Sequence, residues 1–193
     1  GFIFETALYP TDKGTPQGGL ISPLLANMTL DGMEKILVAR LPKRNVHFIR
    51  YADDFLVTAP TKEVAEEARD ILQEFLADRG LELSGEKTVI THIDDGFDFL
   101  GYNFRKYKGM LLVKPSRKSI KTISEKIATI VRKAQAWTQD RLILALNPVI
   151  RGWSNYHRHN AAKRAFGLLD RYVWAVTWKW GKHRHPNKGH KWI

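Results

Sequence analysis

The sequence contains no cysteine, which excludes both a disulfide framework and a zinc site with thiolate ligands. It has no apolar run long enough to cross a bilayer, and Gly1 to Glu5 lack the basic start and long apolar stretch of a signal peptide. These absences predict a cytoplasmic protein without a membrane segment. Its 193 residues are enough for one or two domains with a buried core.

Acidic residues are scarce in the second half of the chain, and tryptophan is missing from the first half. Residues 1–100 contain 10 Lys and Arg against 17 Asp and Glu, whereas residues 101–193 contain 21 against 3. The formal net charge of +11 therefore combines −7 in the first part with +18 in the second, which also carries all six tryptophans. This asymmetry predicts a carboxylate-bearing domain joined to a cationic domain with an anionic partner such as nucleic acid.

Two adjacent carboxylates, Asp53 and Asp54, lie between the short apolar segments 48–49 and 55–57. This pattern predicts a strand, a tight turn that carries the aspartates, and a returning strand. Neighbouring like charges repel each other, and a multivalent cation relieves the repulsion; oxygen ligands favour Mg²⁺, or Mn²⁺ as an alternative, over zinc. An isolated Asp-Asp pair is more often a polar surface turn, so its interpretation depends on the neighbouring motifs.

The segment Tyr51-Ala52-Asp53-Asp54 resembles the catalytic box of reverse transcriptases, and other boxes of that family occur in the expected order. They are a glycine-rich loop with Thr15, Pro16, Gln17 and Gly18 followed by Ile21–Asn27, the segment Leu81–Leu83 with Lys87 and Thr88, and Phe99, Leu100, Gly101 and Tyr102. The resemblance implies RNA-directed DNA polymerisation from a DNA primer and deoxynucleoside triphosphates. Each box alone is a weak signal, whereas their order is a strong one.

The resemblance also implies a role for each box. Asp53 would be the shared metal ligand, Asp54 a weaker or indirect ligand, and Lys87 would neutralise or protonate the leaving pyrophosphate. An exposed turn lysine is the alternative interpretation of Lys87. The loop residues Thr15 to Gly18 would form the floor under the nucleotide and template, and Phe99 to Gly101 would grip the primer.

Beyond Pro115 the chain resembles the thumb, or maturase, domain of group II intron-encoded proteins through Asn147-Pro148, Arg151-Gly152-Trp153 and Tyr156. The resemblance implies intron RNA as a partner. The candidate RNA contacts are Arg117, Lys118, Arg151, Arg158, Lys163 and Arg164. At helical spacing, aromatic residues are more often core or bundle-edge residues than base-stacking platforms. The residues concerned are Trp153, Tyr156, Trp174 and Trp178.

The predicted fold is α+β, with a partial palm in residues 1–114 and an all-α thumb of about three helices with a basic tail in residues 115–193. The palm would be a mixed or antiparallel sheet with helices on one face. The expected palm elements are a helix from Ser22 to Arg40, a helix from Thr61 that stops at Gly80, strands at 81–83 and 89–93 around a turn at Ser84-Gly85, and a hairpin of 97–107 with 110–113 that turns at Lys108-Gly109. The buried residues of the first helix would include Leu24, Leu25, Met28 and Met33. The apolar face of the second helix would consist of Val64, Ala68, Ile71, Leu72, Phe75 and Leu76. In the thumb we expect helices from Ser116, from Asn147-Pro148, and over 162–180. The apolar stripe of the first of these helices would consist of Ile120, Ile123, Ile127, Ile130 and Ala134.

One feature of the family is missing from this sequence. A further aspartate from an earlier palm strand completes the metal site in the family, and only Glu5 and Asp12 precede the glycine-rich loop here. We therefore expect the chain to be the C-terminal part of a longer enzyme, inactive as a polymerase without the N-terminal fingers and palm portion.

Two other interpretations remain open at this stage. The first is a non-catalytic RNA-binding or maturase module that acts only in splicing, and the second is a basic helical DNA-binding protein. The second explains the charge of residues 101–193 but not the ordered boxes before them. Retron and CRISPR-linked reverse transcriptases share the palm boxes, so the assignment to group II introns depends on the thumb.

Overall fold

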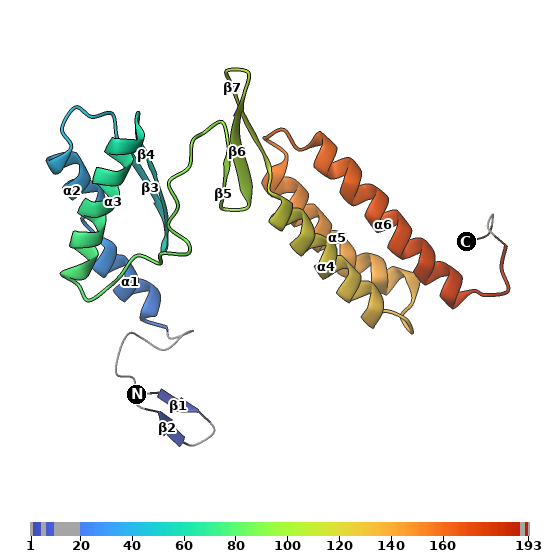
Figure 1. Cartoon of the computed structure of the whole chain (residues 1–193). Coiled ribbons are helices and arrows are strands. Elements are labelled where there is room, and N and C mark those ends of the chain that lie inside the picture. The colour runs from blue at the N-terminus through green and yellow to red at the C-terminus, as the bar shows by residue number, and fades with distance from the viewer. Residues whose placement is uncertain (1, 5–6, 10–19, 190–191, 193) are drawn as a thin grey trace. The chain divides into compact units, whose positions relative to one another are not determined.

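The computed structural model describes residues 2–4, 7–9, 20–189 and 192. By their internal contacts the residues form two compact units, Gly1–Ile90 and Thr91–Ile193 (Figure 1). The predicted α+β class is confirmed, since short antiparallel sheets and helices occur in the first unit and a sheet followed by a helical bundle in the second. In the described part of the chain, no helix is both long and apolar enough to cross a bilayer.

The first unit is built around a β-hairpin and two helices. Strands β3 (His47–Tyr51) and β4 (Asp54–Thr58) pair antiparallel, as do β1 (Phe2–Phe4) and β2 (Ala7–Tyr9). Helices α2 (Met33–Arg40) and α3 (Lys62–Ala77) share one apolar core, and Phe48, Phe55 and Val57 of the hairpin pack against it. One face of the hairpin is therefore covered by helices, and the predicted hairpin around Asp53 and Asp54 is confirmed.

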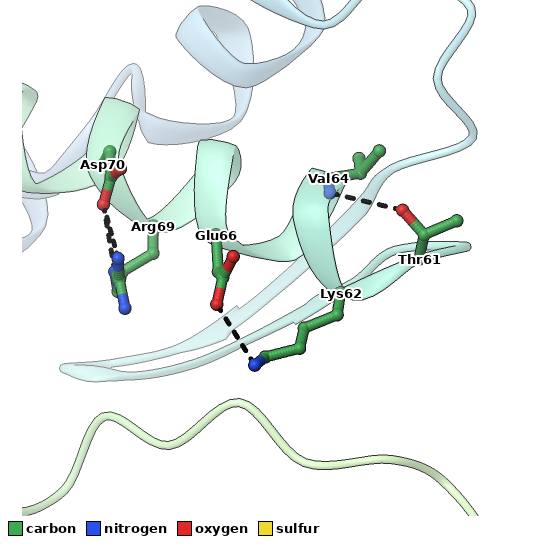
Figure 2. Close-up of polar contacts among 6 residues, drawn as sticks. All are labelled: Thr61, Lys62, Val64, Glu66, Arg69 and Asp70. Atoms are coloured by element: carbon green, nitrogen blue, oxygen red, sulfur yellow. Dashed lines mark hydrogen bonds and ion pairs between the residues drawn. The ribbon is translucent and has the colours of Figure 1, made fainter.

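Helix α3 follows directly from its sequence. The Thr61 hydroxyl accepts a hydrogen bond from the Val64 amide at 3.4 Å, which caps the helix (Figure 2). The predicted apolar face is buried and consists of Val64, Ala68, Ile71, Leu72, Phe75 and Leu76. On the outer face, Lys62 pairs with Glu66 at 3.5 Å and Arg69 with Asp70 at 2.9 Å, both exposed to solvent (Figure 2). Such exposed pairs contribute little stability.

The helix predicted from Ser22 to Arg40 is wrong in its continuity. The structure has α1 (Ser22–Leu30), which starts at an Ile21 N-cap, and a separate α2, because Asp31 is extended and Gly32 has a φ of 97°. The predicted burial of Met33 is confirmed. The predicted burial of the α1 side chains is wrong, because Leu24, Leu25 and Met28 are 58%, 38% and 66% exposed.

The strands predicted at 81–83 and 89–93 are also wrong, because these described residues form no strand. The turn between them does form, and the amides of Lys87 and Thr88 donate to the Ser84 carbonyl at 3.1 and 2.8 Å. Three to five apolar residues become a strand only where a neighbouring strand supplies backbone partners. The described residues of this chain offer none at that place.

The second unit begins with a three-stranded antiparallel sheet. Its strands are β5 (Phe97–Phe99), β6 (Tyr102–Tyr107) and β7 (Met110–Pro115). The single strand predicted over 97–107 is wrong, because a tight turn at Leu100-Gly101 divides it. The second predicted turn, at Lys108-Gly109, is confirmed by the pairing of Tyr107 with Met110.

Three helices complete this unit among its described residues: α4 (Arg117–Lys133), α5 (Gln139–His157) and α6 (Lys163–Arg184). The predicted helical thumb is confirmed, and Ser116 caps α4 by accepting from the Ser119 amide at 3.0 Å. The helix start predicted at Asn147-Pro148 is wrong, because both residues lie inside α5. Leu142 and Leu146 before Pro148 and Val149 and Trp153 after it pack into one core, which compensates for the lost hydrogen bond at proline.

Candidate active site

The two aspartates occupy the tip of the β3–β4 hairpin. Tyr51 pairs with Asp54, so Ala52 and Asp53 form the turn between the strands. Ala52 has a φ of 55°, in the left-handed region that usually favours glycine. Because side chains alternate along a strand, Asp54 shares the uncovered face with Tyr51, whereas Arg50 and Phe55 point to the helix-covered face.

Arg50 holds this turn from the helix-covered face of the hairpin. Its guanidinium donates to the Ala52 carbonyl at 2.9 Å and to the Asn27 side-chain oxygen at 3.0 Å. Asn27 belongs to α1, so one side chain connects the aspartate turn to the helix that follows the glycine-rich loop. This contact gives α1 a specific place beside the hairpin although the helix buries no residue.

Both aspartates are exposed, and neither carboxylate forms a hydrogen bond or ion pair with another described residue. Two adjacent hard oxygen donors without a cationic partner fit a divalent ion such as Mg²⁺. Within the described residues no group of three acidic, histidine or cysteine side chains could hold a metal. The donor set therefore fits a cation in part, with Asp53 and Asp54 as two of the ligands.

Of the other predicted palm residues, the structure describes Lys87 but not the glycine-rich loop. Lys87 is exposed in the turn that starts at Ser84, and no described residue pairs with its ammonium group. The predicted nucleotide and template residues lie outside the described residues; they are Thr15, Pro16, Gln17 and Gly18. Their role stays a prediction.

The turn predicted to grip a primer is held by the helices of its own unit. Leu100 and Gly101 have φ values of 49° and 79°, and both carbonyls of the turn are hydrogen-bonded. The Tyr156 hydroxyl donates to the Leu100 carbonyl at 2.8 Å, and the Ser116 amide donates to the Gly101 carbonyl at 2.9 Å. Helix α5 and the start of α4 therefore fix the shape of the turn.

An aromatic cluster lies directly behind this turn. The Tyr102 hydroxyl donates to the Tyr156 carbonyl, and His157 packs at 4.7 Å from the rings of both Tyr102 and Trp153. His157 is 1% exposed, and its Nε2 is 3.1 Å from the Ser119 hydroxyl, which also accepts from the Trp153 indole at 2.9 Å. Burial lowers the pKa of His157 and raises that of Tyr102, because both charged forms lose hydration.

Five of the six predicted RNA contacts gather at one end of the bundle. Arg117 and Lys118 begin α4, and the bond between Ser119 and His157 places that helix start beside the end of α5. Arg158, Lys163 and Arg164 flank the α5–α6 turn, which is tied to β7 by the Ala161 amide donating to the Val113 carbonyl at 3.0 Å. The sixth, Arg151, lies inside α5, six residues before its last residue His157.

All six of these cations are exposed, and none forms an ion pair with an acid of the described chain. The same end of the bundle carries the turn at Leu100-Gly101. An unpaired cationic cluster beside a rigid backbone turn is a surface suited to phosphates.

The comparison with known families assigns the first part of the chain. Residues 3–104 match the model of the reverse transcriptase (RNA-dependent DNA polymerase) family, which is more than half of the chain. The chain belongs to the reverse transcriptase family. Residues 120–193 match the maturase-specific domain of group II introns, so the reverse transcriptase is of the group II intron type that its thumb motifs indicated.

Curated relatives of the chain include a group II intron-encoded protein and a retron reverse transcriptase. The reverse transcriptase chain is 32% identical to Protein YkfC of Escherichia coli, over 47% of this chain and 32% of that protein. It is 23% identical to the group II intron-encoded protein LtrA of Lactococcus lactis, over 68% of this chain and 32% of LtrA. It is 32% identical to the retron Ec86 reverse transcriptase of Escherichia coli, over 39% of this chain and 24% of that protein. The chain thus spans about a third or less of the length of these relatives.

The sequence placed Asn27 and Tyr102 in family boxes but did not predict their supporting contacts, and it gave no role to Arg50 or His157. Arg50 precedes the catalytic box directly, and an arginine in the middle of an apolar strand was a usable signal, because it needs buried or half-buried acceptors. The contacts of Tyr102 and His157 join residues more than fifty positions apart, and no local pattern predicts them.

Proposed function

We propose that this chain supplies the aspartate hairpin and the thumb of a group II intron reverse transcriptase, which copies RNA into DNA and binds intron RNA to assist splicing. The observation that carries the proposal is the hairpin tip with two exposed carboxylates that no described residue pairs with, inside the segment that matches the reverse transcriptase family. In this proposal residues 1–114 form the palm portion and residues 115–193 the thumb.

Asp53 and Asp54 would hold divalent cations at the primer end, with Asp53 as the main ligand. Magnesium supplies activation of the primer 3′-hydroxyl and stabilisation of the leaving pyrophosphate when it is bound. The backbone around these ligands is fixed in advance by Arg50, so little ordering is needed when substrate binds. Lys87 would meet the negative charge that develops on the pyrophosphate.

The second unit would bind RNA mainly through phosphates and shape. The cations that flank the α5–α6 turn and the start of α4 are exposed and unpaired within the described chain, and the turn at Leu100-Gly101 lies at the same end. RNA affinity should therefore fall steeply with salt, by a log–log slope of about −0.7 to −0.9 for each phosphate contact. A nearly flat slope would contradict this part of the proposal.

The described residues bring two carboxylates to the hairpin, so nucleotidyl transfer needs a further carboxylate from another segment or another chain. The test is primer extension on an RNA template with Mg²⁺, comparing this chain alone with a mixture that contains a fingers-and-palm polypeptide of a relative. We expect extension in the mixture and its loss in Asp53→Asn. Extension by this chain alone would show that the missing ligand has been misassigned.

A matched control separates chemistry from binding. Asp31→Asn removes an exposed carboxylate of the same unit at the α1–α2 junction and should leave extension unchanged. Asp53→Asn should leave RNA affinity almost unchanged, because the cations of the second unit carry that affinity. A large loss of RNA binding in Asp53→Asn would mean that the hairpin contacts RNA or maintains the fold.

The presence of only two carboxylates in the described site also favours a second candidate, an RNA-binding maturase module that acts in splicing without polymerisation. The same experiments separate the two functions. Tight, salt-dependent binding of intron RNA together with no extension in any mixture would favour the splicing module.

A further inference from the structure

Helix α6 carries an aromatic pair on the side that faces away from its own core. The residues of α6 that pack into the bundle are Leu169, Tyr172, Val173, Val176 and Trp180. With 3.6 residues per turn, Trp174 and Trp178 lie on the opposite face of the helix. Their rings stack with centroids 5.7 Å apart and planes 12° apart, and Trp174 is 63% exposed.

This arrangement differs from the bundle-edge packing that we expected for the two tryptophans from their spacing. Tryptophan has the largest apolar surface of any side chain, and most of it is normally covered. Because Trp174 is 63% exposed, much of its surface is accessible to a third planar group.

The charges beside the two tryptophans on the same face of α6 indicate the chemistry of the planar group that would stack on Trp174. Spaced by three and four residues, Arg171, Trp174, Trp178 and Lys182 form one row, and both cations are exposed. One turn before Arg171, nothing lies within 4 Å of the position that a Gly167 Cβ would occupy, so the row continues over open surface. Helix α6 has six Lys and Arg residues against the single acid Asp170.

We propose that this row, which we name the α6 platform (Arg171, Trp174, Trp178 and Lys182), binds unpaired RNA by stacking a base on the exposed ring of Trp174, which is itself stacked on Trp178, and by pairing phosphates with the two cations. The proposal deepens the proposed RNA binding and rests on it. Alternating aromatic and cationic groups match the alternation of bases and phosphates in a single strand. Between its two ends a duplex offers only base edges and phosphates, because its base faces are already stacked on one another.

The platform is distinct from the cationic cluster at the α5–α6 turn. Arg158 directly follows α5, and Lys163 and Arg164 begin α6. Trp178 comes 14 residues after Arg164, roughly 20 Å along the helix at 1.5 Å per residue. The cluster suits shape-dependent contact with folded RNA, and the platform adds a preference for unpaired nucleotides that phosphate contacts alone do not give.

The test compares the affinity of the 193-residue chain for an oligouridine of about 12 nucleotides and for an RNA duplex of equal length, by fluorescence anisotropy. We expect Trp174→Ala with Trp178→Ala to weaken oligouridine binding by about tenfold or more and duplex binding by less than about twofold. Leu168→Ala, which shortens another exposed apolar side chain of α6, is the matched control and should change neither affinity.

Two further double variants distinguish a loss of base stacking from a loss of folding. Trp174→Phe with Trp178→Phe retains aromatic faces and should retain most of the oligouridine affinity, whereas Trp174→Leu with Trp178→Leu keeps apolar volume and should lose it. Lys182→Ala should reduce the magnitude of the salt slope by about 0.7, the value for one contact to a single strand.

The outcomes separate this proposal from the function on which it rests. If neither RNA binds the parent chain in a salt-dependent way, the proposed RNA binding itself fails. If the parent binds both RNAs and the double alanine variant binds them equally well, or loses both equally, the platform is wrong and the proposed function stands. A change of self-association in that variant, with unchanged RNA binding, would identify a second copy of the chain as the occupant and overturn the platform.

Discussion

The hydroxyls of Tyr102 and Tyr156 link the turn at Leu100-Gly101 and strand β6 to helix α5, which is far away in the sequence. The Tyr102 hydroxyl donates to the Tyr156 carbonyl, and the Tyr156 hydroxyl donates to the Leu100 carbonyl at 2.8 Å. Their rings lie 5.0 Å apart. These two hydrogen bonds couple the proposed primer-grip turn to helix α5, so a shift of α5 would move the turn with it.

Removal of the Tyr156 hydroxyl should affect the binding of a primer–template duplex more than the stability of the folded chain. Tyr156→Phe loses the bond to the Leu100 carbonyl, which costs about 1 kcal/mol of unfolding free energy. We expect the dissociation rate of a primer–template duplex to rise by several-fold. Urea denaturation and stopped-flow dissociation measure the two effects.

Tyr172→Phe is the matched control for this change, because no described residue hydrogen-bonds its hydroxyl. It should alter neither quantity. An equal dissociation rate in Tyr156→Phe and the parent would show that the turn does not depend on α5 for its shape.

Loss of Arg50 should free the aspartate turn. Arg50→Leu removes the bonds to the Ala52 carbonyl and to Asn27, and we expect faster amide hydrogen exchange at residues 52–54 with a loss of about 1–2 kcal/mol in stability. Arg44→Leu provides the comparison, since its guanidinium bonds no described residue and should leave exchange in the turn unchanged. Unchanged exchange in Arg50→Leu would mean that the strand pairing alone fixes the turn.

His157 should make the stability of the second unit depend on pH. Burial lowers its folded-state pKa below the ordinary value of 6.5, so the unfolded chain takes up a proton at a higher pH than the folded chain. The contribution of neutral His157 is therefore fully present above about pH 7.5 and declines as the pH falls through about 6.5 toward the folded-state pKa.

Urea midpoints between about pH 8 and pH 5 measure this dependence. In His157→Gln, which keeps a polar side chain near Ser119, the decline should become shallower. The same decline in parent and variant would assign the pH dependence to another group.

Local patterns were sufficient where one element carries all the information. Thr61, the apolar face of α3 and Gly80 beyond its end predicted that helix, and the five-residue stripe from Ile120 to Ala134 predicted α4. The hairpin at Asp53 and Asp54 was also predictable, because short apolar segments flank a turn-forming pair.

Local patterns failed where distant partners decide the structure. Pro148 has the properties of a helix start, yet the apolar residues on both sides of it share one core and keep α5 continuous. The segments at 81–83 and 89–93 have strand composition but no described strand to pair with. The exposed apolar residues of α1 follow a helical pattern, but no described core covers Leu24 or Met28.

The most direct measurement of the central claim is the position at which Mn²⁺ binds this chain. Paramagnetic broadening of backbone amide signals detects even weak ion binding and needs no partner chain. We predict broadening centred on residues 52–55 that is lost in Asp53→Asn and retained in Asp31→Asn. Broadening centred instead on the acidic outer face of α3, around Glu66 and Asp70, or left unchanged by Asp53→Asn, would contradict the assignment of the hairpin as the metal-binding part of the polymerase site.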